Sequence, residues 1–341
     1  MGPPRNLLPP PAVGRRVRQT GEARPGSFAR ARNTVAVMFP GQGSQFTGMA
    51  DPWLSDPVSS AVFDAASAQL GFDLAESCRD EESLARTDTV QLGVFVCDVA
   101  AFRVLASAGV RPVAVAGHSL GEFAALVAAG VLEFPAALEA VRQRAEAMAA
   151  ASAAIPGAMT ALMGLSPAEA ADVCAVAGRG DVLTVANENS PKQTVLSGTV
   201  AAIERAEALA RTRGARPIRL RVAGAFHSPL MAPALPGLRS ALARLEFRTP
   251  SCAVVPNVSG RPTTQPAAIR DLLSRHLLSP VRWERSMASL AGLGVTRLIE
   301  AGPGDTLAKL AKRCVPGLDI VSAGTPEEAL AAAGALATVL A

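Results

Sequence analysis

The residue with the most evident chemical potential is Ser119, which occupies the centre of a Gly-x-Ser-x-Gly motif at residues 117–121. An apolar run at 113–116 precedes the motif, and a helix-forming run at 122–129 follows it. A serine at a sharp turn from strand to helix, with small residues beside it, is lifted out of the backbone, where its hydroxyl can act as a nucleophile. The motif therefore predicts covalent acyl chemistry.

A serine nucleophile needs a general base, and the sequence contains three histidines, His118, His227 and His276. His118 adjoins Ser119, so we expect its side chain to point away from the nucleophile. His227 lies in Phe-His-Ser-Pro at the start of a predicted helix and is the favoured base. The alternative for His227 is a helix-capping or buried structural histidine.

The elements around these residues predict an α/β fold with a mainly parallel sheet. A buried strand at 34–39 runs into a glycine loop at 40–45, and an apolar helix at 90–108 precedes the strand of the serine motif. Alternating strands and helices are typical of a parallel sheet covered on both faces. We expect a hydrolase-like large domain formed by residues 33–155 and 223–341.

Between these two parts the pattern changes to β-α-β-β-α-β, the order of a ferredoxin-like unit. We therefore expect an inserted ferredoxin-like small domain at residues 156–222. Its predicted elements are a strand at 158–163, a helix at 167–177, strands at 182–186 and 193–197, a helix at 200–212 and a strand at 216–220. In the large domain, a further helix is predicted at 135–150, before the insert. After the insert we expect helices at 229–245 and 266–278, strands at 252–255 and 296–300, and a terminal helix at 327–341.

The net positive charge belongs to one end of the chain. Residues 1–32 hold seven Arg against one acid, Glu22, whereas the remaining 309 residues hold 26 basic and 28 acidic residues, a net charge of −2. Arginine and proline at this density predict a disordered tail at 1–32. The alternative is a transit peptide, which the arginine content allows but whose amphipathic helix the prolines disfavour. With no Tyr and 4% aromatic residues, the body is not expected to bind nucleic acid.

Cysteine usage and hydropathy predict a cytoplasmic protein. No apolar run is both long enough and free of Gly or Pro to span a bilayer, so no membrane association is expected. Five scattered cysteines without Cys-x-x-Cys spacing argue against a disulfide framework and against a metal site. They are Cys78, Cys97, Cys174, Cys252 and Cys314.

Seven segments that follow one another in order resemble the malonyl-CoA:acyl carrier protein transacylase family, which includes the acyltransferase domains of polyketide synthases. The resemblance spans residues 34–325. The segments are Phe-Pro-Gly-Gln-Gly-Ser-Gln at 39–45, the serine motif with Glu122, Arg144, Val-Ala-Asn-Glu-Asn-Ser at 185–190, Phe226-His227, Pro-Val-Arg-Trp at 280–283 and Glu-Ala-Gly-Pro-Gly at 300–304.

The resemblance implies a ping-pong transfer of malonyl from malonyl-CoA to an acyl carrier protein, for fatty-acid or polyketide synthesis. Ser119 would attack the thioester while His227 takes its proton. His227 would then activate the thiol of the phosphopantetheine that the carrier protein holds. The backbone N–H groups of Gln42 and Leu120 would form the oxyanion hole. A monomer with no bound cofactor is implied.

The resemblance also assigns Arg144, which would bind the free carboxylate of malonate through two hydrogen bonds. The alternative is a solvated helix arginine, as we expect Arg142 to be. Phe226 would fill the space that the methyl group of methylmalonate needs, unless it is an ordinary core residue. Asn189 would bind substrate.

His276 stands where the family usually has Gln. Since the implied role is for the main-chain carbonyl of this residue to orient the catalytic histidine, His276 can serve equally well. A third, acidic member of a triad is not required by this arrangement.

Four other interpretations compete with this one. An α/β-hydrolase esterase would place its histidine near the chain end, after the acid, and family members that hydrolyse acyl groups tend to lack the arginine at position 144. A carrier-binding module without catalysis would not need Ser119 and His227. A transacylase for another acyl-CoA, such as methylmalonyl-CoA, also remains open. The glycine loop lacks the spacing of a dinucleotide site.

Overall fold

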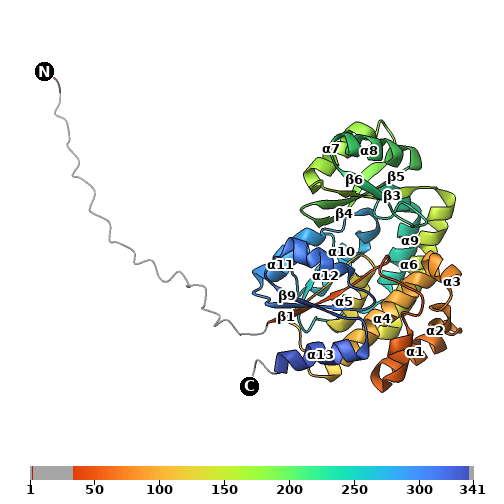
Figure 1. The fold of residues 1–341 in the computed structure, drawn as a ribbon, viewed down its shortest axis with the longest axis vertical. Coiled ribbons are helices and arrows are strands. Elements are labelled where there is room, and N and C mark those ends of the chain that lie inside the picture. Colours follow the sequence, from red (N-terminus) through yellow and green to blue (C-terminus); the bar gives the residue numbers. More distant parts are fainter. Residues whose placement is uncertain (1, 3–33, 338–341) are drawn as a thin grey trace. The chain divides into compact units, whose positions relative to one another are not determined.

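The computed structural model describes residues 2 and 34–337, and Figure 1 shows the order of the elements along the chain. The tail predicted at 1–32 lies outside the described residues except for Gly2, as do the last four residues of the predicted terminal helix. That helix, α13, is described over Pro326–Ala337.

The larger sheet has five parallel strands in the order β7-β2-β1-β8-β9. Phe39 at the end of β1 is level with Gly117 at the end of β2. The loops that follow these two strands, which carry the glycine loop and Ser119, therefore leave the sheet side by side. The strands are β1 Val35–Phe39, β2 Ala114–Gly117, β7 Ala253–Val255, β8 Arg297–Ala301 and β9 Asp319–Ala323.

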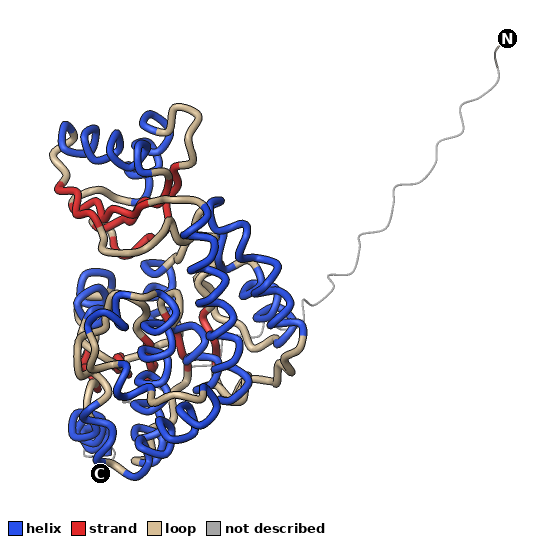
Figure 2. The backbone as a smooth tube through the Cα atoms, turned by 90° about the vertical axis from the view of Figure 1, so that its right-hand side faces the viewer, coloured by secondary structure: helices blue, strands red, loops and turns tan. Residues whose placement is uncertain are grey.

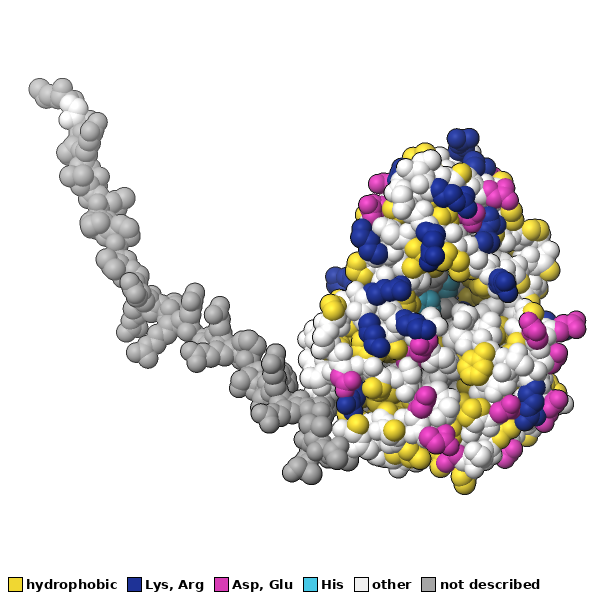
Figure 3. All heavy atoms as spheres, viewed as in Figure 1, with side chains coloured by type: hydrophobic (Ala, Val, Ile, Leu, Met, Phe, Trp, Pro, Cys, Tyr) yellow, Lys and Arg dark blue, Asp and Glu magenta, His cyan; other side chains and the backbone are white. Residues whose placement is uncertain are grey.

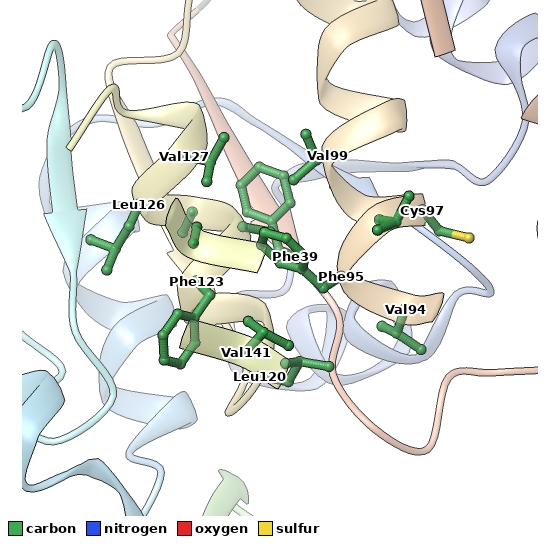
Figure 4. Close-up of a cluster of buried hydrophobic side chains, with 14 of the residues drawn as sticks. Phe39, Val94, Phe95, Cys97, Val99, Leu120, Phe123, Leu126, Val127 and Val141 are labelled. Carbon is green, nitrogen blue, oxygen red and sulfur yellow. The ribbon is translucent and has the colours of Figure 1, made fainter. Parts of the chain in front are cut away.

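Helices cover both faces of this sheet, because its strands are apolar on both sides. In β1, Val35, Val37 and Phe39 belong to the core under α4, α5 and α6, whereas Ala36 and Met38 belong to the core under α11 and α12. Figure 4 shows the first of these cores. The helices are α4 Thr87–Ser107, α5 Gly121–Ala128, α6 Phe134–Ala154, α11 Trp283–Gly292 and α12 Thr306–Cys314.

Helix α4 is long and apolar enough, by length and composition, to cross a membrane. Of its most apolar 18-residue window, however, 78% is buried inside the protein, against α1, α6 and α13. This burial is that of a core helix, in which apolar residues on every side contact protein. Gly93 lies within the helix, so its apolar run is not free of glycine.

The other helices lie mainly on the side of α4 and around the loops that follow the strands. The predicted helix at 229–245 is instead a 3₁₀ helix, η2, followed by α9, because Pro233 and Pro236 lack the N–H groups that a continuous helix needs. The predicted helix at 266–278 is likewise divided into α10 and η3. The bounds are η1 Asp51–Ser55, α1 Pro57–Leu70, α2 Leu74–Ser77, α3 Glu81–Ala85, η2 Pro229–Ala234, α9 Leu235–Ala243, α10 Pro266–Ser274 and η3 His276–Leu278.

A second, antiparallel sheet has the strand order β4-β5-β3-β6. Its helices α7 and α8 pack on one face, and Figures 1 and 2 show them on the side turned away from the parallel sheet. Val281 joins the segment before α11 to β4, because its N–H donates to Ala186 O and its carbonyl oxygen accepts from Glu188 N. The elements are β3 Ala158–Met163, α7 Pro167–Ala177, β4 Leu183–Ser190, β5 Gln193–Gly198, α8 Val200–Thr212 and β6 Arg216–Arg219.

Candidate active site

Ser119 occupies a tight turn between β2 and α5, with a backbone φ of 51°. A left-handed conformation is uncommon for a residue with a side chain, and here it turns the chain directly from strand to helix. Gly117 and Gly121 permit the bend, since a Cβ on Gly117 would lie 2.0 Å from the carbonyl of Gly121. The predicted strand, turn and helix around Ser119 are confirmed.

His227 contacts Ser119 directly, with its Nε2 2.8 Å from Ser119 Oγ. Its other ring nitrogen, Nδ1, lies 3.1 Å from the main-chain oxygens of both His276 and Ser279. Carbonyl oxygens only accept hydrogen bonds, so Nδ1 carries the proton and Nε2 is left to accept the hydroxyl proton of Ser119. No carboxylate contacts the His227 ring among the described residues.

The buried position of His227 keeps it in the neutral form that a base requires. Burial is the main cause that lowers its pKa to about 3, and the positive charge of Arg144 adds to the effect. Because the pKa lies below the usual value, protonation inactivates this base only at a lower pH than usual.

If Ser119 is acylated by malonyl-CoA, as the resemblance implies, we expect kcat/KM for this acylation to stay nearly constant as the pH falls from 7 to 5. An ordinary histidine with a pKa of about 6.5 would lose activity by about 25-fold over this range. Stopped-flow measurement of CoA release, with circular dichroism at each pH as a check on folding, tests the expectation. An acid limb centred near pH 6.5 would contradict it.

Arg144, on α6, is 1% exposed and also contacts Ser119. Its Nη2 lies 3.3 Å from Ser119 Oγ, and its Nη1 donates to Gln91 Oε1. Among the described residues no carboxylate lies within 4.0 Å of the guanidinium, and its Nε has no hydrogen-bond partner. Burial lowers the pKa of Arg144 to about 10, so the side chain stays charged at neutral pH.

Arg142 on the same helix provides a contrast. It is partly exposed and forms ion pairs with Glu139 and Glu146. The alternative that Arg144 is a solvated helix arginine is therefore wrong, whereas the expectation for Arg142 is confirmed.

Gln42 and Leu120 lie beside Ser119 on the wall of one cavity. Their backbone N–H groups donate to no other group in the described part of the chain, so both are free to bind an oxyanion. The N–H of Ser119 itself is engaged, because it donates to Asn257 Oδ1 at 2.7 Å. The glycine loop packs directly on the turn, since a Cβ on Gly41 would lie 2.4 Å from the carbonyl oxygen of His118.

The cavity measures about 70 Å³ and draws its walls from both sheets. Ser119, His227 and Arg144 lie together on its wall, and Figure 3 shows His side chains inside a hollow of the surface. The remaining wall is mainly apolar, formed by Met148, Met159, Leu220, Val222 and Phe226. Such a space suits a short acyl group with one charged end. Among the described residues no cluster of three or more His, Cys, Asp or Glu could hold a metal ion.

Asn189 and His118 differ from the sequence-based picture. Asn189 Oδ1 lies 2.8 Å from His118 Nε2, and Asn187, rather than Asn189, lines the cavity. His118 also lines the cavity, with its ring 5.4 Å from that of Trp283. We therefore assign the wall position to Asn187, and Asn189 lies behind His118.

The side chain of His276 is buried, although only its main-chain carbonyl was predicted to matter. Its ring lies perpendicular to that of His227 at 5.2 Å, and its Nε2 is 3.8 Å from Glu122 Oε2. Burial lowers the pKa of His276 well below its usual value and raises that of Glu122 to about 7. The imidazole next to His227 is therefore uncharged at neutral pH.

Sequence reasoning missed Gln91 and Asn257, which hold the guanidinium of Arg144 and the backbone of Ser119. Both are fully buried polar residues, at 0% and 1% exposure. The sequence shows Gln91 only as a polar residue in an apolar helix and Asn257 only as a polar residue after a short strand. Neither has a spacing to Ser119 that would indicate a contact.

Comparisons with known proteins agree with this geometry. A family model described as an acyl transferase domain matches residues 37–330. The malonyl CoA-acyl carrier protein transacylase of Escherichia coli (strain K12) is 41% identical over 306 residues, which cover 88% of this chain and 98% of that protein.

Two solved structures have the same fold. The malonyl CoA-acyl carrier protein transacylase from Coxiella burnetii superposes with a TM-score of 0.85 at 37% identity, covering 89% of this chain and 98% of that one. A chain from a complex of a type II PKS acyl-carrier protein with its malonyl-transacylase gives 0.85 at 36% identity, covering 89% and 100%. Sequence, fold and site thus lead to one conclusion: the chain belongs to the malonyl CoA-acyl carrier protein transacylase family of acyl transferases.

Proposed function

We propose that the protein transfers a malonyl group from malonyl-CoA to the phosphopantetheine thiol of an acyl carrier protein, in fatty-acid or polyketide synthesis. One observation carries the proposal: Arg144 holds a buried positive charge beside Ser119, and among the described residues no carboxylate lies within 4.0 Å of its guanidinium. A buried guanidinium without a counter-ion is costly, and the free carboxylate of a malonyl group would supply one with matching geometry.

In the first half-reaction, Ser119 Oγ attacks the thioester carbonyl carbon while His227 Nε2 accepts the hydroxyl proton. The N–H groups of Gln42 and Leu120 stabilise the negative oxygen of the tetrahedral intermediate. When the intermediate collapses, the C–S bond breaks and His227 returns the proton to the sulfur of CoA. Malonyl-Ser119 remains.

In the second half-reaction, His227 takes the proton of the phosphopantetheine thiol, and the sulfur attacks the ester of malonyl-Ser119. Collapse of this intermediate breaks the bond to Ser119 Oγ, which regains its proton from His227. The main-chain oxygens of His276 and Ser279 hold the ring in one tautomer throughout, so no acidic residue is needed for that purpose.

The test is intact-mass analysis of the purified chain after incubation with malonyl-CoA alone. We expect a mass increase of one malonyl group, which is lost when a holo acyl carrier protein is added and appears on that protein. Loss of the adduct to water faster than to the carrier protein would instead favour the acyl-hydrolase alternative.

The size of the Phe226 side chain is expected to affect the choice between malonyl-CoA and methylmalonyl-CoA. Its ring lines the cavity and is 6% exposed, so a smaller residue would add space beside the acyl group. We expect Phe226→Ser to raise kcat/KM for methylmalonyl-CoA relative to malonyl-CoA by about tenfold, since one methyl group is worth about 1–3 kcal/mol of discrimination. Competition between the two thioesters, read by mass spectrometry, measures the ratio; an unchanged ratio would make Phe226 an ordinary core residue.

We also propose that the antiparallel sheet with α7 and α8 is an inserted ferredoxin-like domain at 156–222, within a hydrolase-like large domain at 33–155 and 223–341. The β-α-β-β-α-β order of its elements supports this division. We further propose a cytoplasmic monomer. The absence of disulfides among the five cysteines, all of which are described, is compatible with a reducing compartment.

A further inference from the structure

We propose that Asn257 is a positioning residue that clamps the backbone of the nucleophile turn. The inference deepens the proposed function and rests on it for the identity of the acyl donor. Asn257 follows β7 and is 1% exposed. Its carboxamide reaches both sides of the turn: Oδ1 accepts from Ser119 N at 2.7 Å, and Nδ2 donates to Gly117 O at 2.5 Å.

The backbone of Asn257 completes the clamp. Its N–H donates to Glu122 Oε2 at 3.0 Å, and Glu122 lies in the first turn of α5. One residue therefore holds the end of the strand, the nucleophile and the start of the helix. The two ends of the carboxamide match their partners. Its oxygen accepts from Ser119 N, which can only donate, and its NH₂ group donates to Gly117 O, which can only accept.

The turn needs such support because of its conformation. A residue other than glycine at a positive φ is strained and keeps that conformation only when its surroundings impose it. Ser119 has no other backbone hydrogen bond through its N–H in the described part of the chain. Asn257 is anchored to the sheet, since Val255, two residues before it, pairs with Ala116 of β2. The clamp therefore ties the position of Ser119 Oγ to the sheet that carries the glycine loop.

This contact also decides which amides can serve the oxyanion. Because the N–H of Ser119 is committed to Asn257, the intermediate depends on the N–H groups of Gln42 and Leu120. Releasing Asn257 would let the turn relax and would move Oγ relative to both amides and to His227. A misplacement of about 1 Å can lower a rate by about 100-fold.

The test compares Asn257→Asp and Asn257→Ser with wild type in the full chain. Asp keeps the size and the acceptor for Ser119 N but turns a carboxylate oxygen toward Gly117 O, whereas Ser is too short to bridge both groups. Ser59→Ala is the matched control, because it removes a buried hydrogen bond, to Trp53 O at 2.7 Å, from α1. The stability of each variant is measured by urea unfolding.

Two rates are measured for each variant: acylation by malonyl-CoA in single turnover, and labelling of Ser119 by a small fluorophosphonate, which has no carboxylate. The end point of labelling counts the competent sites, so rates are expressed per competent site. We expect both rates to fall by about 10- to 100-fold in the Asn257 variants. The half-saturating malonyl-CoA concentration should stay within about threefold, since the Arg144 contacts are unchanged.

Wild-type rates per competent site in both Asn257 variants, with only a loss of stability like that of Ser59→Ala, would overturn the proposal. The fluorophosphonate separates this failure from failure of the proposed function. If wild type is not acylated by malonyl-CoA yet labelling slows in the Asn257 variants, the acyl donor is wrong and the clamp stands.

Discussion

Replacing Ser119 by alanine is expected to abolish the malonyl adduct and to lower malonyl transfer to the carrier protein by at least about 10⁴-fold. In the proposed mechanism Ser119 Oγ is the atom that bonds to the acyl group, and among the described residues no second serine, threonine or cysteine lines the cavity. Intact-mass analysis measures the adduct, and transfer to a holo carrier protein in quenched-flow samples measures the rate.

Two further variants, Ser286→Ala and His227→Ala, serve as controls for Ser119→Ala. Ser286→Ala removes a buried hydroxyl from α11 that bonds to Arg282 O, and it should leave the adduct intact. His227→Ala should slow acylation strongly, and adding Ser119→Ala to it should cost little more, because the two residues act as a unit. A malonyl adduct that persists in Ser119→Ala would place the chemistry on another residue.

Replacing Arg144 by alanine is expected to lower kcat/KM for malonyl-CoA by about 10³-fold. Removing one partner of a buried charge pair costs about 3–5 kcal/mol. Among the described residues that line the cavity, Arg144 is the one Lys or Arg available to the carboxylate of a bound malonyl group. Acetyl-CoA has no carboxylate, so its kcat/KM should not fall. The expected result is thus a change of specificity and not a general loss of activity.

Arg142→Ala is the matched control, since it removes an arginine from the same helix that pairs only with Glu139 and Glu146 at the surface. It should leave both substrates unaffected. Arg144→Lys should behave more like Arg144→Ala than like wild type, because an ammonium group cannot form two parallel hydrogen bonds to a carboxylate. Equal losses for malonyl-CoA and acetyl-CoA in Arg144→Ala would show that Arg144 only supports the fold.

Local signals in the sequence were sufficient for many elements. The helix Pro167–Ala177 was predicted to the residue, because Ser166 with Glu169 forms a capping box and Pro167 begins the first turn. The strand at 158–163 was also predicted with its observed bounds. In contrast, β9 was not predicted. It is an edge strand whose residues are mostly half-exposed, so it lacks the apolar run that reveals a buried strand.

In the site, too, residues in a local motif could be predicted from the sequence, whereas residues that contact them from far along the chain could not. Ser119 stood out because its whole turn is encoded within five consecutive residues. Asn257 contacts it from 138 positions away, and Gln91 contacts Arg144 from 53 positions away. A single sequence carries no spacing that connects such pairs, so only the folded chain reveals them.

The left-handed backbone at Ser119 and His227, with φ of 51° and 56°, restricts which amino acids these positions can ever accept. Threonine offers the same hydroxyl as serine, but its branched Cβ fits poorly at positive φ. Cysteine is unbranched and would fit the turn. Any descendant of this enzyme that changes its nucleophile by a single substitution is therefore confined to unbranched side chains, and conformation, as well as reactivity, has selected serine.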